Sequence, residues 1–196
     1  MPKNYLVGCQ KLKDRQVPEI PVLHRTVARS LHRVLDPVDL AAIFKFEHEW
    51  YLYYLLLLTT GMRPDDAAQL TSANFSWKRT IIGYVKEGSE KYVEVPVPQD
   101  VLRLVPHDHS ATKPLFPRLC VDVEDPWIME EALNERLGQP ADFLEALLTA
   151  AGRPTASLVS FRITLQQELS GCKQDIDSAL QSLLQKIPEP MEIAST

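Results

Sequence analysis

The pattern of apolar and polar residues predicts two helices between residue 36 and residue 60. Asp36 is expected to cap the first helix, with Pro37 in its first turn and Asp39 three residues after the cap. The second helix, which runs through Trp50 to Thr60, is apolar almost all round. A helix without a polar face is usually buried, so this segment is predicted to lie at the centre of the core.

The apolar run breaks at Gly61, and Arg63 follows two positions later. Gly61 permits the tight end of one helix, and Pro64 suits the first turn of the next, which is expected to run to about Leu70. Arg63 would then be held between two packed helices. A guanidinium held in this way can bind a phosphodiester through two parallel hydrogen bonds. The alternative is an arginine that caps a helix corner and binds no ligand.

Between residues 80 and 97 the pattern becomes that of a β-hairpin. Residues 80–85 and 92–97 are rich in β-branched and aromatic residues, and a short polar segment with one glycine separates them. Pro96 places the second strand at an edge or ends its pairing. Lys86 and Lys91 stand at the two ends of the turn. They are interpreted either as solubilising charges or as side chains that reach into a groove of DNA.

The last third of the chain has the clearest helical period. Apolar residues mark one face of a helix over residues 158–169, which Gly171 terminates, and of another over 176–187, which Pro188 stops. Together these patterns predict a mainly α fold with a small antiparallel β-hairpin or sheet.

Composition places the chain among ordinary globular proteins. It has 196 residues, of which 45% are hydrophobic and 24% are charged. Its longest apolar run is about half of what a membrane span needs, and no signal-peptide pattern opens it. The three cysteines are far apart in the sequence, which suits a reducing compartment. We therefore expect a cytoplasmic protein, nucleoid-associated if it binds DNA, with no membrane segment, cofactor or metal site.

Charge is distributed unevenly along the chain. Residues 1–35 carry seven Lys/Arg against two acids, a net +5, whereas the remainder carries −10. The first 35 residues are interpreted as a basic arm or linker, in which Arg25, Arg29 and Arg33 contact phosphates and release counterions. The alternative is a solvated terminus. A domain over residues 36–187 and a tail over 188–196 complete the predicted organisation.

An acidic stretch lies in the second half of the domain. Residues 122–145 contain eight acids, with Arg118 and Arg136 nearby. We expect a solvated helical insert at about 120–145. The alternative is a surface that binds another protein.

Arg63, Lys86 and Arg162 follow one another in an order that resembles a known family. The segment TGMRPDDAAQL, residues 60–70, is similar to the T-G-x-R-x-x-E-x-x-x-L motif of the tyrosine recombinase (phage integrase) catalytic domain, with Asp66 in place of the glutamate. The segments LDPVDLAAI, VKEGSEKYVEVPV and PLFP look like the opening helix, the lysine hairpin and the connection to the second half. The resemblance covers about 150 residues, and its order and spacing are more specific than any single piece.

The resemblance implies a role in DNA recombination or integration, with duplex DNA as the partner. In that family two arginines bind the scissile phosphate, a lysine protonates the departing 5′ oxygen, and a tyrosine near the C-terminus attacks the phosphate. Carried over by position, Arg63, Lys86 and Arg162 form the inherited phosphate-binding set.

Three departures from the family pattern concern the chemistry itself. Val159 stands where the family has a histidine three residues before the second arginine. Lys186 stands near the family's second histidine position, where it keeps a positive charge with a different geometry and is expected to contact DNA. All six tyrosines precede Arg162, and the expected nucleophile position falls around Ser195. Because losing one member of a coupled catalytic set removes most of the rate, this chain is predicted to bind DNA, or to pair with an active recombinase, without cleaving DNA by itself.

Two alternatives stay open. The first is a truncated active integrase, whose reading frame would continue to a tyrosine about ten residues beyond Thr196. The second is a recombinase fold repurposed as a protein-interaction module.

Overall fold

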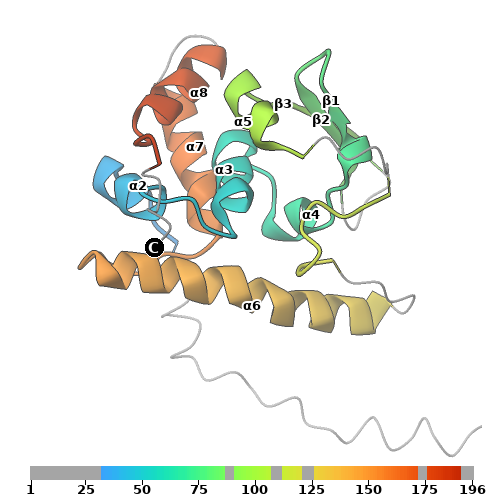
Figure 1. Cartoon of the computed structure of the whole chain (residues 1–196), viewed down its shortest axis with the longest axis horizontal. Helices are drawn as coiled ribbons and strands as arrows, with labels where there is room; N and C mark the ends of the chain where they lie inside the picture. The colour runs from blue at the N-terminus through green and yellow to red at the C-terminus, as the bar shows by residue number, and fades with distance from the viewer. Residues whose placement is uncertain (1–31, 87–90, 107–111, 121–125, 172–175, 191–196) are drawn as a thin grey trace, which may run out of the picture. The chain divides into compact units, whose positions relative to one another are not determined.

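The computed structural model describes residues 32–86, 91–106, 112–120, 126–171 and 176–190. These residues belong to one compact unit, Leu31–Thr196. The described part is mainly helical and contains one small three-stranded antiparallel sheet (Figure 1). The fold class predicted at this level is confirmed. None of the helices in these ranges combines the length and apolar character that crossing a membrane requires.

Helix α2 (Pro37–Ile43) begins as its sequence predicts. The Asp36 carboxylate accepts hydrogen bonds of 2.9 Å from the backbone N–H groups of Val38 and Asp39. In return, the Asp39 carboxylate accepts one of 3.0 Å from the Asp36 N–H. The carboxylate of each aspartate thus accepts a hydrogen bond from the backbone N–H of the other. This is the capping box expected from their spacing.

Helix α3 (Tyr51–Thr60) lies at the centre of the core, as predicted. Residues 55–58 are at most 4% exposed, and α3 contacts α4, α5 and α7. Tyr53 and Tyr54 are fully buried, and their phenols donate to the backbone oxygens of Pro64 (2.9 Å) and Pro140 (2.5 Å). These two hydrogen bonds attach α3 to the first residue of the helix that follows it, α4 (Pro64–Ala68), and to the long helix α6 (Pro126–Ala150).

The sheet has strand order β1-β2-β3 and follows α4 along the chain. Its elements, with the two helices that precede it, are α4 (Pro64–Ala68), η1 (Ser72–Asn74), β1 (Phe75–Ser76), β2 (Ile81–Val85) and β3 (Tyr92–Pro96). The predicted hairpin is confirmed, with Ile81 opposite Pro96 and Val85 opposite Tyr92. Pro96 lies in the edge strand, where its missing N–H leaves no gap in the ladder. Strand β1 was not predicted, because two residues are too short to show a period.

Helix α6 (Pro126–Ala150) crosses beneath α2, α3 and α4 (Figure 1). From Pro126 onward the acidic stretch is helical, as expected, and its acids at 131, 135, 142 and 145 are exposed, whereas residues 122–125 lie outside the described part. Its other side is part of the core, since Leu133, Leu144 and Leu148 are at most 3% exposed. The segment expected as an insert is therefore a layer of the domain.

Three further helices complete the described part. They are α5 (Gln99–Leu104), α7 (Val159–Gly171) and α8 (Ile176–Gln185). The predicted helix ends at Gly171 and before Pro188 agree with these bounds. Helix α7 packs on both α3 and α8, so it joins the central helix to the end of the chain.

Candidate phosphate-binding site

The corner between α3 and α4 is built by three consecutive features of the sequence. Gly61 caps α3 with φ of 63°, a left-handed conformation that favours glycine. Arg63 precedes α4 in extended conformation, and Pro64 occupies the first turn of that helix. The Tyr53 hydroxyl donates a hydrogen bond of 2.9 Å to the Pro64 carbonyl, which attaches the corner to α3. The backbone of Arg63 is therefore fixed on both sides, as the sequence predicts.

Arg63 carries an ion pair at this corner. Its Nε donates to Asp65 Oδ1 at 3.1 Å, and its Nη2 contacts Asp65 Oδ2. The Arg63 side chain is 46% exposed, whereas that of Asp65 is 17% exposed. Asp65 thus occupies one edge of the guanidinium, and the rest of the group faces solvent.

Arg162 reaches the same corner from α7, 99 positions later in the sequence. A Cβ atom placed on Gly61 would lie 3.9 Å from Arg162 Cγ and 3.1 Å from Leu165 Cδ2. The stem of Arg162 therefore passes beside the glycine that precedes Arg63 by two residues. Gly61 serves two purposes here, since it adopts the left-handed turn and leaves room for α7.

Tyr84 on β2 belongs to the same neighbourhood. Burial is the largest cause that raises the pKa of the Tyr84 phenol, the carboxylates of Asp66 and Asp65 raise it further, and the Arg162 guanidinium acts against them. Electrostatic effects of this kind weaken with distance. Helix α7 therefore meets the corner beside Gly61, and Tyr84 of β2 is within electrostatic range of Asp65, Asp66 and Arg162. We call Arg63, Asp65, Asp66 and Arg162 the corner cluster.

Lys86 and Lys91 continue the hairpin past the ends of β2 and β3. The Lys86 N–H donates to the Lys91 carbonyl at 3.1 Å, so these two residues are the next cross-strand pair. Side chains alternate along a strand, and directly paired residues share a face. Both lysines therefore lie on the same face of the hairpin as Tyr84, and both are exposed.

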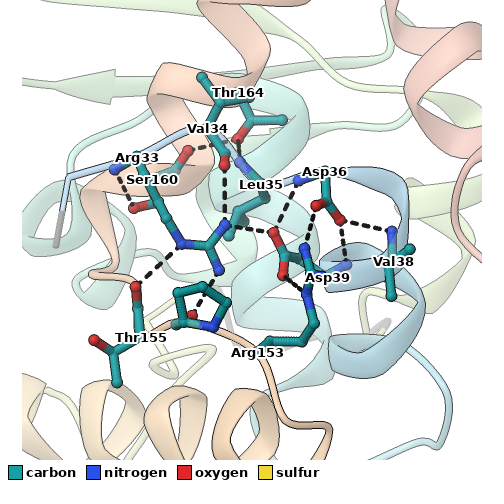
Figure 2. A network of polar contacts seen from close by, with 11 residues as sticks. Arg33, Val34, Leu35, Asp36, Val38, Asp39, Arg153, Thr155, Ser160 and Thr164 are labelled. Carbon is teal, nitrogen blue, oxygen red and sulfur yellow. Dashed lines mark hydrogen bonds and ion pairs between the residues drawn. The ribbon is translucent and has the colours of Figure 1, made fainter.

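Arg33 has a different place from the one expected for an arm residue. Its guanidinium donates to the carbonyls of Val34 (3.1 Å), Pro154 (2.7 Å) and Thr155 (3.1 Å), and to Asp39 Oδ2 at 2.5 Å (Figure 2). The folded domain thus begins before residue 36, and Arg33 is one of its internal contacts. The side chain is 23% exposed and makes four hydrogen bonds within the chain, so its contacts in the structure are intramolecular. A contact of Arg33 with DNA stays a prediction.

Arg153 completes this second cluster. Its Nε donates to Asp39 Oδ1 at 2.7 Å, and its Nη2 contacts Asp36 Oδ2 (Figure 2). We call Arg33, Asp36, Asp39 and Arg153 the α2 clasp, because it ties the start of α2 to the segment between α6 and α7. Although burial of Asp39 opposes ionisation, hydrogen bonds from Arg33 and Arg153 lower its pKa from 3.8 to about 2.

Lys186, predicted as a DNA contact, lies in an ion pair with a residue of α7 in the structure. Its Nζ contacts Glu168 Oε2 at 2.7 Å, and the hydrogen bond from Lys186 is the main cause that lowers the pKa of Glu168. Lys186 lines a cleft of about 180 Å³ between the start of α2, α7 and α8. The structure therefore places Lys186 in a partly exposed ion pair with Glu168 of α7 at this cleft.

The remaining predicted residues divide into two groups. Arg25, Arg29 and the tail around Ser195 lie outside the described residues. Val159 is the first residue of α7, one turn before Arg162, and contributes no proton-transfer group. Tyr53 and Tyr54 are core residues whose pKa values burial raises, which makes them unsuitable as nucleophiles.

Asp65, Tyr84 and Arg153 were not singled out by the sequence. Asp65 follows Arg63 by two positions, so their proximity was visible in the sequence, whereas their pairing depends on the turn geometry. Tyr84 alternates with Lys86 along the hairpin, which was a signal that both share a face. Arg153 had no local signal, because its partners lie more than 110 positions away.

Comparison with known proteins does not assign the chain to a family. No protein-family model matches it, and no match was found among curated proteins or among solved structures.

Proposed function

We propose that this chain is a degenerate tyrosine-recombinase-like domain that binds duplex DNA through phosphate contacts and does not cleave it. Arg63, Arg162, Lys86 and Lys91 are the proposed contacts. Such a domain acts in DNA recombination or integration as a DNA-binding component or as the partner of an active recombinase.

The observation that carries this proposal is the meeting of Arg162 with the Gly61–Arg63 corner. Two arginines from distant helices at one exposed corner are what a phosphodiester needs, since each guanidinium can donate two parallel hydrogen bonds to phosphate oxygens. The lysine pair on the Tyr84 face of the hairpin adds positive charge next to β2. The order Arg, Lys, Arg is the order of the family that the sequence resembles.

Binding without cleavage follows from the residue types near the corner. Cleavage by this mechanism needs a phenol that attacks phosphorus and a group that accepts its proton. Tyr84 has a raised pKa, and its electrostatic neighbours include two carboxylates, which disfavour the phenolate. Val159 supplies no base. Among the described residues, the corner therefore has groups that can stabilise phosphate charge but neither a reactive phenol nor a base beside it.

Equilibrium binding to DNA tests the proposal with a matched pair of arginines. Arg63 and Arg103 are both exposed and both pair with an aspartate close by in sequence, Asp65 and Asp100. With a fluorescently labelled duplex of roughly 30 base pairs, Arg63→Ala is expected to weaken binding about tenfold and to lower the salt slope by about 1. Arg103→Ala should change neither quantity appreciably. Equal affinities and equal salt slopes for the two variants would contradict the proposal.

One observation favours a second function, protein binding through α6. Glu131, Glu135, Asp142 and Glu145 are exposed, and at 100° per residue they fall within about 80° of one another. Arg136, the basic residue of this segment, is turned towards the Cys120 carbonyl. A wild-type protein that shows no salt-dependent retention on DNA would favour this second function over the first.

A further inference from the structure

Asp65 is the feature of the corner cluster that a phosphate-binding site does not need. Its carboxylate takes the Nε–Nη2 edge of the Arg63 guanidinium, which is one of the two edges that could hold a phosphate with paired hydrogen bonds. A carboxylate and a phosphodiester present the same arrangement of two oxygens to an arginine. Asp65 therefore occupies a position that would suit a phosphate.

The carboxylates of the corner cluster also reduce the positive charge that an approaching phosphate meets. Arg63 and Arg162 are accompanied by the carboxylates of Asp65 and Asp66, so the four side chains of the corner cluster carry no net charge. Asp66 is nearly buried, whereas Asp65 is partly exposed beside the arginine. Of the two acids, Asp65 is the one whose field acts directly on an anion that approaches Arg63.

We propose that Asp65 is a built-in competitor that limits the affinity of Arg63 for the phosphodiester of duplex DNA. This inference rests on the proposed DNA-binding function. The carboxylate neutralises Arg63 in the unbound protein, and an incoming phosphate must displace it or bind in its repulsive field.

The geometry provides a route for this exchange. The Nη1 side of Arg63 is not part of the contact with Asp65, and the side chain is 46% exposed. A phosphate can therefore approach the outer edge of the guanidinium while the ion pair is intact. When the pair opens, Asp65 remains in the first turn of α4, where backbone N–H groups favour a negative charge.

A charge-matched comparison tests the role of Asp65. Asp65→Asn and Asp100→Asn each remove one negative charge from an aspartate that pairs with an exposed arginine. With a labelled duplex of roughly 30 base pairs, Asp65→Asn is expected to bind about three to ten times more tightly than wild type. Asp100→Asn should differ by less than about twofold, because an exposed charge elsewhere is screened by salt.

Placing Asp65→Asn in the Arg63→Ala background makes the test specific. If the carboxylate acts through Arg63, the gain should shrink to that of Asp100→Asn when Arg63 is absent. Weaker binding by Asp65→Asn would show that Asp65 positions Arg63 and would overturn the inference, as would a gain equal to that of Asp100→Asn.

The two proposals fail in different ways. If wild type binds DNA and Arg63→Ala weakens that binding, but Asp65→Asn brings no gain, the inference about Asp65 falls and the DNA-binding function stands. If Arg63→Ala binds as tightly as Arg103→Ala, the DNA-binding function falls, and the inference about Asp65 falls with it. Circular dichroism and thermal unfolding of each variant exclude a loss of fold as the cause.

Discussion

The α2 clasp and the corner cluster both combine two arginines with two aspartates, but their surroundings differ. In the clasp, Asp39 is fully buried, and its two arginines are 23% and 27% exposed. At the corner, Arg63 is 46% exposed and is held by a carboxylate two residues away. The clasp joins segments more than 110 positions apart, whereas the Arg63–Asp65 pair is local.

This difference separates structural arginines from arginines that can bind a ligand. Arg33 donates four of its five N–H groups to three backbone carbonyls and Asp39, so most of its hydrogen-bonding capacity is used within the chain. Arg63 engages one edge of its guanidinium and exposes the remainder. Residue type and charge were the same in both cases. The number of engaged donors, and the burial of the acid that engages them, distinguish the two roles.

The largest effect is expected from breaking the clasp at its buried acid. Asp39→Ala removes the partner of two arginines and the acceptor of the Asp36 N–H. Removing one partner of a buried ion pair leaves uncompensated charge, so the free energy of unfolding should fall by about 3 kcal/mol. Urea unfolding followed by circular dichroism measures this change. Asp65→Ala at the corner should cost less than about 1 kcal/mol, and equal losses at the two sites would contradict the comparison.

The second-largest effect is expected from acid, which should weaken the α2 clasp. Asp39 has a folded-state pKa of about 2 and an ordinary value of 3.8. A group with a lowered folded-state pKa stabilises the protein above its unfolded pKa, and this stabilisation is lost as the pH falls towards the folded value. The difference in unfolding free energy between wild type and Asp39→Asn should therefore shrink by about 2 kcal/mol between pH 5 and pH 2.

This acid experiment has an internal check. Other carboxylates titrate in the same range, but they are present in both proteins and cancel in the difference. A difference that stays constant between pH 5 and pH 2 would mean that Asp39 is not held ionised by Arg33 and Arg153.

The smallest effects are expected from replacing arginine by lysine in each cluster. Arg153→Lys keeps the charge but cannot contact Asp36 and Asp39 with a planar fork, so unfolding should become easier by about 1 kcal/mol. Arg162→Lys should change stability by less than about 0.5 kcal/mol, because that side chain is exposed. It should instead weaken duplex binding about threefold, since lysine makes no paired contact with phosphate. Weaker DNA binding by Arg153→Lys, with Arg162→Lys unchanged, would reverse the assignment of the two clusters.

Local features of the chain were determined by the sequence itself. The capping box of Asp36 and Asp39, the left-handed end of α3 at Gly61 and the hairpin with Pro96 at its edge each follow from neighbouring residues. Such features depend on backbone preferences and on hydrogen bonds within a few positions, which a sequence displays directly. The corner that holds Arg63 was predictable for this reason.

Which charges are internal and which face solvent depends on contacts between distant segments. Arg33 and Arg63 are alike as residues, yet one meets Asp39 and the segment before α7, and the other meets Asp65 and solvent. Likewise, α6 packs on the core through Leu133, Leu144 and Leu148, although the acids on its other side are exposed. Burial and pairing depend on the segments that meet in space. The contacts that join Arg33 to Pro154 and Arg153 to Asp39 span more than 110 positions, so no local pattern of apolar and polar residues displays them.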